Sequence, residues 1–180
     1  MNKYYKQKQI IARVNKKGEI IGRIEKWEAH KKGILHKALT VSLIYKDHYV
    51  IQHRKHIAFD GVFDITISSH QLYINDKLQS TIEAGLDCLQ REWNLTAKDF
   101  IGKPKILGAV YYKAKDEKSI FTEHEVCDMV EVKLKRLPQP NFDFAYGYSL
   151  VKKEELLNKN SRIYENLAPW VKVAIAKKMI

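Results

Sequence analysis

A strand followed by a helix, read from Phe59 to Leu95, constrains the fold of this chain more than any other stretch. Between Val62 and Ser68 polar and apolar side chains alternate, and Phe63 and Ile67 belong to the apolar set. Alternation with a period of two residues is typical of a half-buried strand. The chain then crosses an irregular polar segment before a helical pattern begins, so we expect a strand and a helix that pack together.

The helix is expected over residues 80–95, because apolar side chains recur there at the spacing of one helical face. That face consists of Ile82, Leu86, Leu89 and Trp93. Ser80 and Glu83 have the spacing of a capping box, which satisfies free N–H groups at a helix start. Asn94 suits a helix end, since asparagine tolerates the left-handed conformation.

The remaining chain reads as a mixed sheet with two or three helices, an α+β fold with α/β/α layers. The expected strands are 9–14, 19–25, 37–45, 49–53, 106–113, 120–134 and 144–150. Residues 26–36 are expected to be irregular, and Pro104 is expected to break the chain. A short helix is expected at 152–157 and a C-terminal helix at about 168–178, with Pro169 in its first turn.

Length and composition predict one domain over residues 1–180, with a short basic N-terminal tail, 1–8, that is expected to fray. Apolar residues make up 45% of the chain, enough for a core. The sequence contains no run of about 18 apolar residues, so a membrane span is not expected. The N-terminus does not read as a secretory signal, and two cysteines fit a reduced compartment, so a cytoplasmic location is expected.

The net charge of +11 favours an anionic partner: a diphosphate, a nucleic acid or a membrane surface. A lysine-rich surface that only maintains solubility explains it equally well. Helix-turn-helix spacing, zinc-finger spacing and an aromatic RNA-binding signature are all missing from the sequence. Nucleic acid is therefore an unlikely partner.

Carboxylates and histidines supply the candidate chemistry. Glu123 and Glu125 lie two apart on an expected strand, so both point to one face while His124 points to the other. Three further histidines fall in expected loops or at strand ends: His30, His36 and His70. Imidazoles with carboxylates suit a divalent transition metal. An exposed acidic edge with ordinary surface histidines is the alternative.

Four sequence pieces together produce a resemblance. They are W-E-A-H-K-K-G-I-L-H-K-A, S-S-H-Q-L-Y, E-H-E-V-C and, near the end, A-P-W. The chain resembles the type I isopentenyl-diphosphate isomerases and the isomerase-like Nudix hydrolases, from about Gly18 to Lys178. The resemblance implies the Nudix fold, in which a mixed sheet lies between helices, and a small diphosphate as substrate.

The resemblance also implies a divalent transition metal, Mn or Zn, held by three histidines and two glutamates. By motif these are His30, His36, His70, Glu123 and Glu125. Glu92, in R-E-W-N-L, matches a helix glutamate that helps hold magnesium bound to the diphosphate.

Further roles follow from the same resemblance. Glu125 is expected to transfer a proton, and Tyr112 to hydrogen-bond near the reacting carbon. The ring of Trp170 is expected to stabilise a carbocation. The basic residues expected to hold the diphosphate are Arg54 and Lys55.

The sequence departs from the family at two places. Ser68, in S-S-H-Q, stands where the isomerases have a catalytic cysteine, and a hydroxyl is a far weaker acid than a thiol. The Nudix helix keeps only Glu92 of three glutamates, with Asp87, Cys88 and Arg91 at the other key places. Three interpretations stay open: an isomerase-like enzyme, a Nudix hydrolase of another diphosphate, and a non-catalytic diphosphate-binding homologue.

Overall fold

A computed structural model describes residues 3–180, and the first two residues of the expected tail lie outside the described range. The strands are β1 Ile10–Val14, β2 Ile20–Glu25, β3 His36–Tyr45, β4 His48–Arg54, β5 Phe63–Asp64, β6 Thr66–Ser69, β7 Tyr73–Ile74, β8 Lys77–Leu78, β9 Phe100–Lys115, β10 Thr122–Leu134 and β11 Ala145–Lys152. The helices are α1 Lys26–Lys32, α2 Thr81–Trp93, α3 Lys153–Leu157, α4 Arg162–Asn166 and α5 Pro169–Ala176, with short 3₁₀ helices η1 Lys3–Lys6 and η2 Ala97–Asp99.

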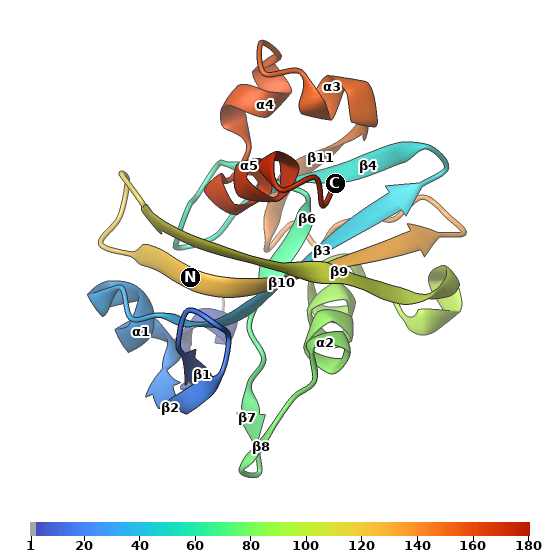
Figure 1. Ribbon diagram of the computed structural model, residues 1–180. Helices are drawn as coiled ribbons and strands as arrows, with labels where there is room; N and C mark the ends of the chain where they lie inside the picture. Colours follow the sequence, from blue (N-terminus) through green and yellow to red (C-terminus); the bar gives the residue numbers. More distant parts are fainter. Residues whose placement is uncertain (1–2) are drawn as a thin grey trace.

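The main sheet is mixed and has helices on both faces, with α2 on one side and α5 on the other (Figure 1). At its centre β3 runs parallel to β10, and β10 pairs antiparallel with the long strand β9. Side chains alternate between the two faces. Leu39 and Val41 therefore pack under α2 with Trp93, whereas Cys127 and Met129 face α5 and Trp170. The expected α+β architecture is confirmed.

The pairing register of the strands aligns three side chains that were predicted from the sequence as site residues. Glu125 on β10 lies opposite His36 on β3 and opposite Tyr112 on β9. Residues directly opposite in neighbouring strands share a face. His36, Glu125 and Tyr112 therefore form a row across the sheet, on the side that carries α5.

Helix α2 follows its sequence signals closely. The Ser80 side chain accepts from the Glu83 backbone N–H, and the Glu83 carboxylate accepts from the Ser80 N–H, so the capping box is present. Asn94 caps the C-terminus at φ 51°, in the left-handed region. The expected helix is confirmed, and it ends directly after the carboxylate of Glu92.

Two segments differ from the sequence expectation. Residues 26–32 form α1 instead of an irregular segment, with Glu25 as its N-cap and Gly33 as its left-handed C-cap. Strand β9 continues through Pro104, where a break was expected. Strand β9 pairs only with β10, and the pairing is irregular between Glu131 and Lys133, so the missing N–H of proline removes no ladder hydrogen bond.

The N-terminal tail also differs, because η1 is packed instead of frayed. Tyr5 is only 8% exposed, and its backbone carbonyl accepts from Trp27 Nε1 at 3.1 Å. Its ring makes edge contacts with Trp27, His56 and Phe144. Within residues 3–180 no helix has the length and apolar character needed to cross a membrane.

Candidate metal centre and pocket

Five side chains with metal-binding atoms converge at one end of the sheet. They are His30, His36, His70, Glu123 and Glu125, all buried, with one ligand atom from each lying within 4.8 Å of the others. His30 Nε2 lies 3.3 Å from Glu123 Oε2. Glu125 Oε1 lies 3.3 Å from His36 Nε2 and 3.1 Å from His70 Nε2. The five residues singled out from the sequence are thus brought together.

The five candidate ligands come from four local structures. His30 lies in the last turn of α1, and Gly33 at φ 60° then turns the chain back towards β3 and His36. A side chain at position 33 would be strained in that conformation, and its Cβ would contact Thr122 at 3.4 Å. His70 directly follows β6, and the two glutamates lie on one face of β10. Secondary structure therefore supplies all five ligands from fixed elements.

Backbone carbonyls fix the tautomers of two histidines. His30 Nδ1 contacts the Lys26 carbonyl and His36 Nδ1 the Ile34 carbonyl, each at 2.7 Å. A carbonyl only accepts, so both Nδ1 atoms carry a proton, which leaves the Nε2 atoms as the ones able to bind a metal. This is the usual orienting contact of a metal-ligating histidine.

The donor set fits a divalent cation because imidazole nitrogens and carboxylate oxygens converge on one point. His36 Nε2 and His70 Nε2 lie 3.2 Å apart, and both face the Glu125 carboxylate. Within residues 3–180, Glu123 Oε2 is buried and makes no hydrogen bond, although His30 Nε2 lies 3.3 Å away. In their deprotonated forms, three imidazoles and two carboxylates are a chemically sensible cage for a transition-metal ion.

A small cavity of about 40 Å³ adjoins this cluster. Tyr112, 6% exposed, donates a hydrogen bond to Glu125 Oε2, and burial with the charge of Glu125 raises the pKa of Tyr112 well above its ordinary value. Ser68 also lines the cavity, and its hydroxyl lies 2.8 Å from Thr40 Oγ1, which is 3.4 Å from Cys127 Sγ. The Ser68 hydroxyl therefore belongs to a strand that borders the same cavity as the five-residue cluster.

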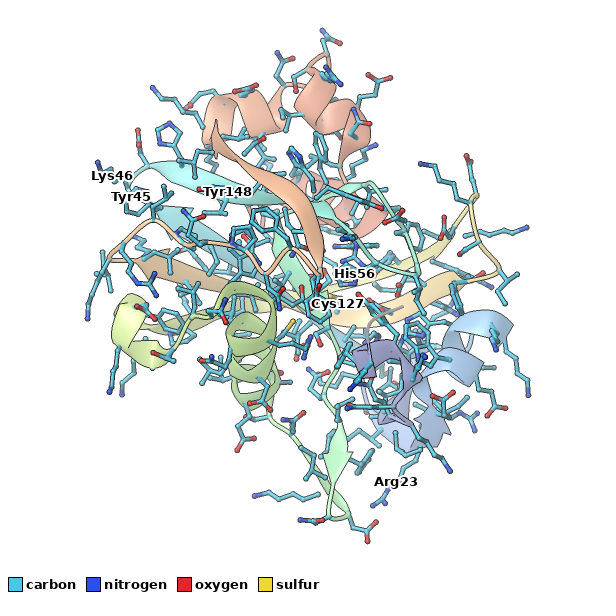
Figure 2. The ribbon with its side chains drawn as sticks, turned by 180° about the vertical axis from the view of Figure 1, so that it is seen from behind. Arg23, Tyr45, Lys46, His56, Cys127 and Tyr148 are labelled. Atoms are coloured by element: carbon cyan, nitrogen blue, oxygen red, sulfur yellow. The ribbon has the colours of Figure 1, made fainter. Side chains whose placement is uncertain are left out.

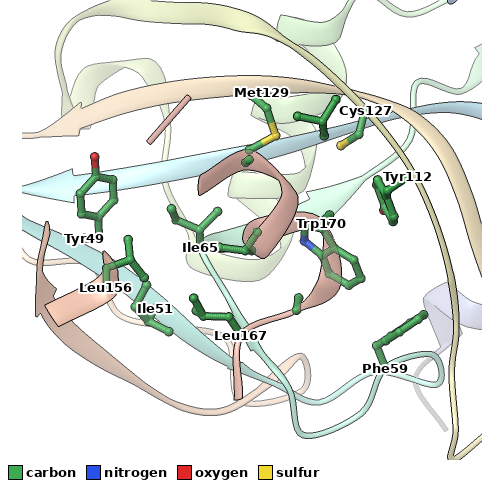
Figure 3. Packing of buried hydrophobic residues seen from close by; sticks show 14 of the residues in the cluster. Tyr49, Ile51, Phe59, Ile65, Tyr112, Cys127, Met129, Leu156, Leu167 and Trp170 are labelled. Atoms are coloured by element: carbon green, nitrogen blue, oxygen red, sulfur yellow. The ribbon is translucent and has the colours of Figure 1, made fainter. Parts of the chain in front are cut away.

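A buried ion pair forms the wall next to α5. Arg54 Nη1 donates to Asp64 Oδ2 at 2.8 Å, and Trp170 Nε1 donates to Asp64 Oδ1 at 2.9 Å. The Arg54 guanidinium lies 5.2 Å from the Trp170 ring centroid. Figure 3 shows Trp170 packed near Tyr112 and Phe59. Asp64 thereby fixes two of the predicted site residues, Arg54 and Trp170, against the cavity that both line.

Lys55 lies outside the cavity, whereas residues absent from the sequence-based set line it. The Lys55 ammonium donates to the Phe142 carbonyl at 3.0 Å and lies 5.7 Å from the Tyr146 ring centroid. The additional lining residues include Tyr5, Lys26, His56 and Arg91. His56, labelled in Figure 2, lies on the loop after β4. Lys26 immediately precedes the W-E-A-H motif and Arg91 immediately precedes Glu92, so adjacency to recognised motifs was the available signal.

Glu92 lines the other end of the cavity, and protein donors surround it. Its Oε1 accepts from Arg91 Nη2 at 2.9 Å and from Cys88 Sγ at 3.4 Å. Burial alone would raise the pKa of Glu92, but the nearby His56 and Arg91 hold it well below its ordinary value. Burial and Arg54 lower the pKa of His56, which leaves that imidazole neutral at pH 7. Arg91 is therefore the positively charged group that stays paired with Glu92 at neutral pH.

Fold comparisons define the class of the protein: it has the Nudix fold. The protein DR0079 of Deinococcus radiodurans superposes with a TM-score of 0.64, covering 94% of this chain and 98% of that chain at 14% identity. A MutT protein from Methanosarcina mazei Go1 superposes with a TM-score of 0.59, covering 81% of this chain and 92% of that chain at 13% identity. The Nudix hydrolase RenU from M. smegmatis gives 0.50, covering 94% and 91% at 10% identity. At these identities the likeness concerns the fold alone.

A comparison of sequences finds a relative whose likeness extends over nearly the whole chain. The chain is a distant homologue of human isopentenyl-diphosphate delta-isomerase 2, with 26% identity over 189 aligned residues that cover 96% of this chain and 82% of that protein. No protein-family model matches the chain. The resemblance read from the four motifs is confirmed, and the buried cluster is consistent with a metal site of that kind.

Proposed function

We propose that the protein isomerises a small homoallylic diphosphate, as its relative's name, isopentenyl-diphosphate delta-isomerase, describes. The observation that carries the proposal is the five-ligand cluster, which opens on the same cavity as Tyr112 and Ser68. In this proposal Mn or Zn occupies the cluster and supplies positive charge beside the Glu125 carboxylate when bound. The expected location is the cytoplasm.

The reaction needs two proton transfers and no other exchange. A proton is added to the terminal alkene carbon, which leaves positive charge on the neighbouring tertiary carbon. Loss of a proton from the carbon on the other side then forms the new double bond. We assign the two transfers to Glu125 and Ser68, acting on opposite faces of the substrate.

Aromatic groups beside these two residues suit the cationic intermediate. The Trp170 ring and the Tyr112 ring lie 6.0 Å apart at their centroids, and both line the cavity. A carbocation over the face of Trp170 would be stabilised by attraction to the ring quadrupole. The Tyr112 hydroxyl holds the Glu125 carboxylate through its hydrogen bond.

Unpartnered donors in the cavity wall support an anionic ligand. The atoms are Tyr5 Oη, Arg54 Nε and Arg91 Nε, each buried without a hydrogen-bond partner among residues 3–180. Buried polar atoms without partners are rare in native structures, so three on residues of one cavity wall indicate a ligand with several acceptor oxygens. We propose that Arg54 holds the diphosphate, together with Lys26 in the role foreseen for Lys55.

The substitution at Ser68 supports a second candidate, a non-catalytic diphosphate-binding homologue. A serine hydroxyl is a poor proton donor at neutral pH without a strong partner, and its neighbours are Thr40 and, beyond it, Cys127. Hydrolysis is less well supported, because Nudix hydrolysis uses several carboxylates around magnesium, and among residues 3–180 Glu92 is the only lining carboxylate outside the five-residue cluster.

An assay with isopentenyl diphosphate tests these alternatives on the metal-loaded protein. Product is followed by NMR for the wild type and for Ser68→Cys, with Ser69→Cys as a matched control that places a thiol one residue away. We expect slow isomerisation by the wild type and at least a tenfold gain in Ser68→Cys only, because a thiol is the stronger acid. Absence of turnover in all three proteins would refute the isomerase assignment, and released phosphate would indicate a hydrolase.

A further inference from the structure

The environment of Glu92 does not fit the magnesium ion that the family resemblance implies. Glu92 is 1% exposed, and N–H donors approach both of its oxygens. Arg91 Nη2 lies 2.9 Å from Oε1, and Gln52 Nε2 lies 3.3 Å from Oε2. His56 Nε2 lies 3.6 Å from Glu92 Oε2. The carboxylate is already bound by the protein.

Magnesium needs a different arrangement. It takes near-octahedral oxygen ligands at about 2.1 Å and keeps several waters. An ion bound to Glu92 Oε1 would lie beside the Arg91 guanidinium, and two positive charges at that separation repel each other. Among residues 3–180, the other carboxylates that line the cavity are Glu123 and Glu125, which belong to the five-ligand cluster. Asp87 is exposed and accepts from Gln79.

Arg91 is built into the wall as a fixed cation. Its guanidinium lies 4.0 Å from the Tyr4 ring centroid, and its Nη2 also donates to Cys88 Sγ at 2.9 Å. Burial lowers the pKa of Arg91, but Cys88 and Glu92 raise it further, so the group stays charged. One of its donors, Nε, is buried without a partner.

We infer that Arg91 replaces magnesium, so that the cavity binds a diphosphate group without a divalent ion at Glu92. Lys26, Arg54 and Arg91 all line the cavity, and these three positive charges exceed the two negative charges of Glu92 and of Asp64, which pairs with Arg54. Guanidinium groups bind phosphate oxygens through charge-assisted hydrogen bonds. This inference rests on the proposed function, because it assumes that the ligand of the cavity is a diphosphate.

Calorimetry with inorganic pyrophosphate tests the inference on protein whose five-ligand cluster is loaded with zinc. The titration is run in magnesium-free buffer and again with excess magnesium. We expect dissociation constants that agree within about threefold, because Arg91, a residue of the chain itself, supplies the positive charge that neutralises the pyrophosphate. Binding that is tenfold or more tighter with magnesium would overturn the inference and leave the proposed function standing. Absence of binding in both buffers would overturn both.

Variants at position 91 test whether the charge of Arg91 is what allows pyrophosphate to bind without magnesium. Arg91→Met removes the charge and should weaken magnesium-free binding by at least tenfold, whereas added magnesium should restore part of it by binding the freed Glu92. Arg91→Lys keeps the charge and should retain magnesium-free binding to within tenfold. Arg136→Met is the matched control, because Arg136 pairs with Asp99 outside the cavity. Unchanged magnesium-free binding in a folded Arg91→Met protein would contradict the inference.

Discussion

The two ends of the cavity hold carboxylates in opposite ways. At the cluster end, the ligand atoms of three imidazoles and two glutamates lie within 4.8 Å of one another, an arrangement that fits a cation from outside the chain. At the α2 end, Glu92 is bound by a guanidinium from the same helix. The same residue type thus indicates a metal ligand in one place and an internal ion pair in the other. What distinguishes them is whether the neighbouring groups are further metal-binding side chains or a guanidinium that donates hydrogen bonds.

Removing a ligand at the cluster end should have the largest effect. His36→Ala should lower the affinity for zinc by more than about 100-fold, beyond the 10–100-fold typical of losing an outer contact. Metal content after dialysis, measured by elemental analysis, checks this. His48→Ala is the matched control, since His48 pairs with Asp47 away from the cluster, and it should keep its metal. Full metal content in His36→Ala would contradict the assignment of the site.

At the α2 end, Glu92→Gln should cost stability and leave the metal bound. Breaking a buried pair costs about 3–5 kcal/mol, and we expect about 2 kcal/mol because the Arg91 side chain is 24% exposed. The pKa of Glu92 is depressed in the folded state, so its contribution is complete above the unfolded value near 4.3 and is lost as pH falls through the folded value. Urea unfolding of both proteins at pH 7 and pH 4 should show a smaller difference at pH 4. An equal difference at both values would contradict the ion-pair description.

The same contrast explains which parts of the site could be predicted from the sequence. Glu123 and Glu125 fall on one face of a strand by alternation alone, and α2 carries its capping box and Asn94 explicitly. The convergence of His30 with the β10 glutamates was expected from the family resemblance, since no local pattern connects α1 to β10.

The cavity wall could not be predicted in this way. Tyr5, His56 and Arg91 are far apart in the sequence and meet only because η1, the loop after β4 and α2 pack together. The path of β9 through Pro104 depends on its being an edge strand, which is a property of the assembled sheet. Tertiary packing therefore decides whether a given carboxylate meets a donor or another acceptor.

Loss of an outer contact at the cluster end should have a smaller effect than loss of a ligand. Tyr112→Phe removes the hydrogen bond to Glu125 Oε2 while the ring keeps its packing beside Trp170. We expect zinc affinity to fall by about tenfold, as for other outer contacts of metal ligands. Competition with a chelating dye measures the affinity, and Tyr111→Phe, on the neighbouring exposed position of β9, is the control. Equal affinities in the two variants would show that Tyr112 does not orient Glu125.

A change at the far end of α2 should affect stability and neither end of the cavity. Ser80→Ala removes the side-chain acceptor of the Glu83 N–H and should cost about 1 kcal/mol in unfolding free energy. Glu92 lies more than three turns further along the same helix, where Arg91 and Gln52 hold its carboxylate in the folded state. Zinc content and pyrophosphate binding should therefore match the wild type, with urea unfolding as the measure of the cost. A loss of pyrophosphate binding in the folded Ser80→Ala protein would mean that the α2 end of the cavity depends on the whole helix and not on the local contacts of Glu92.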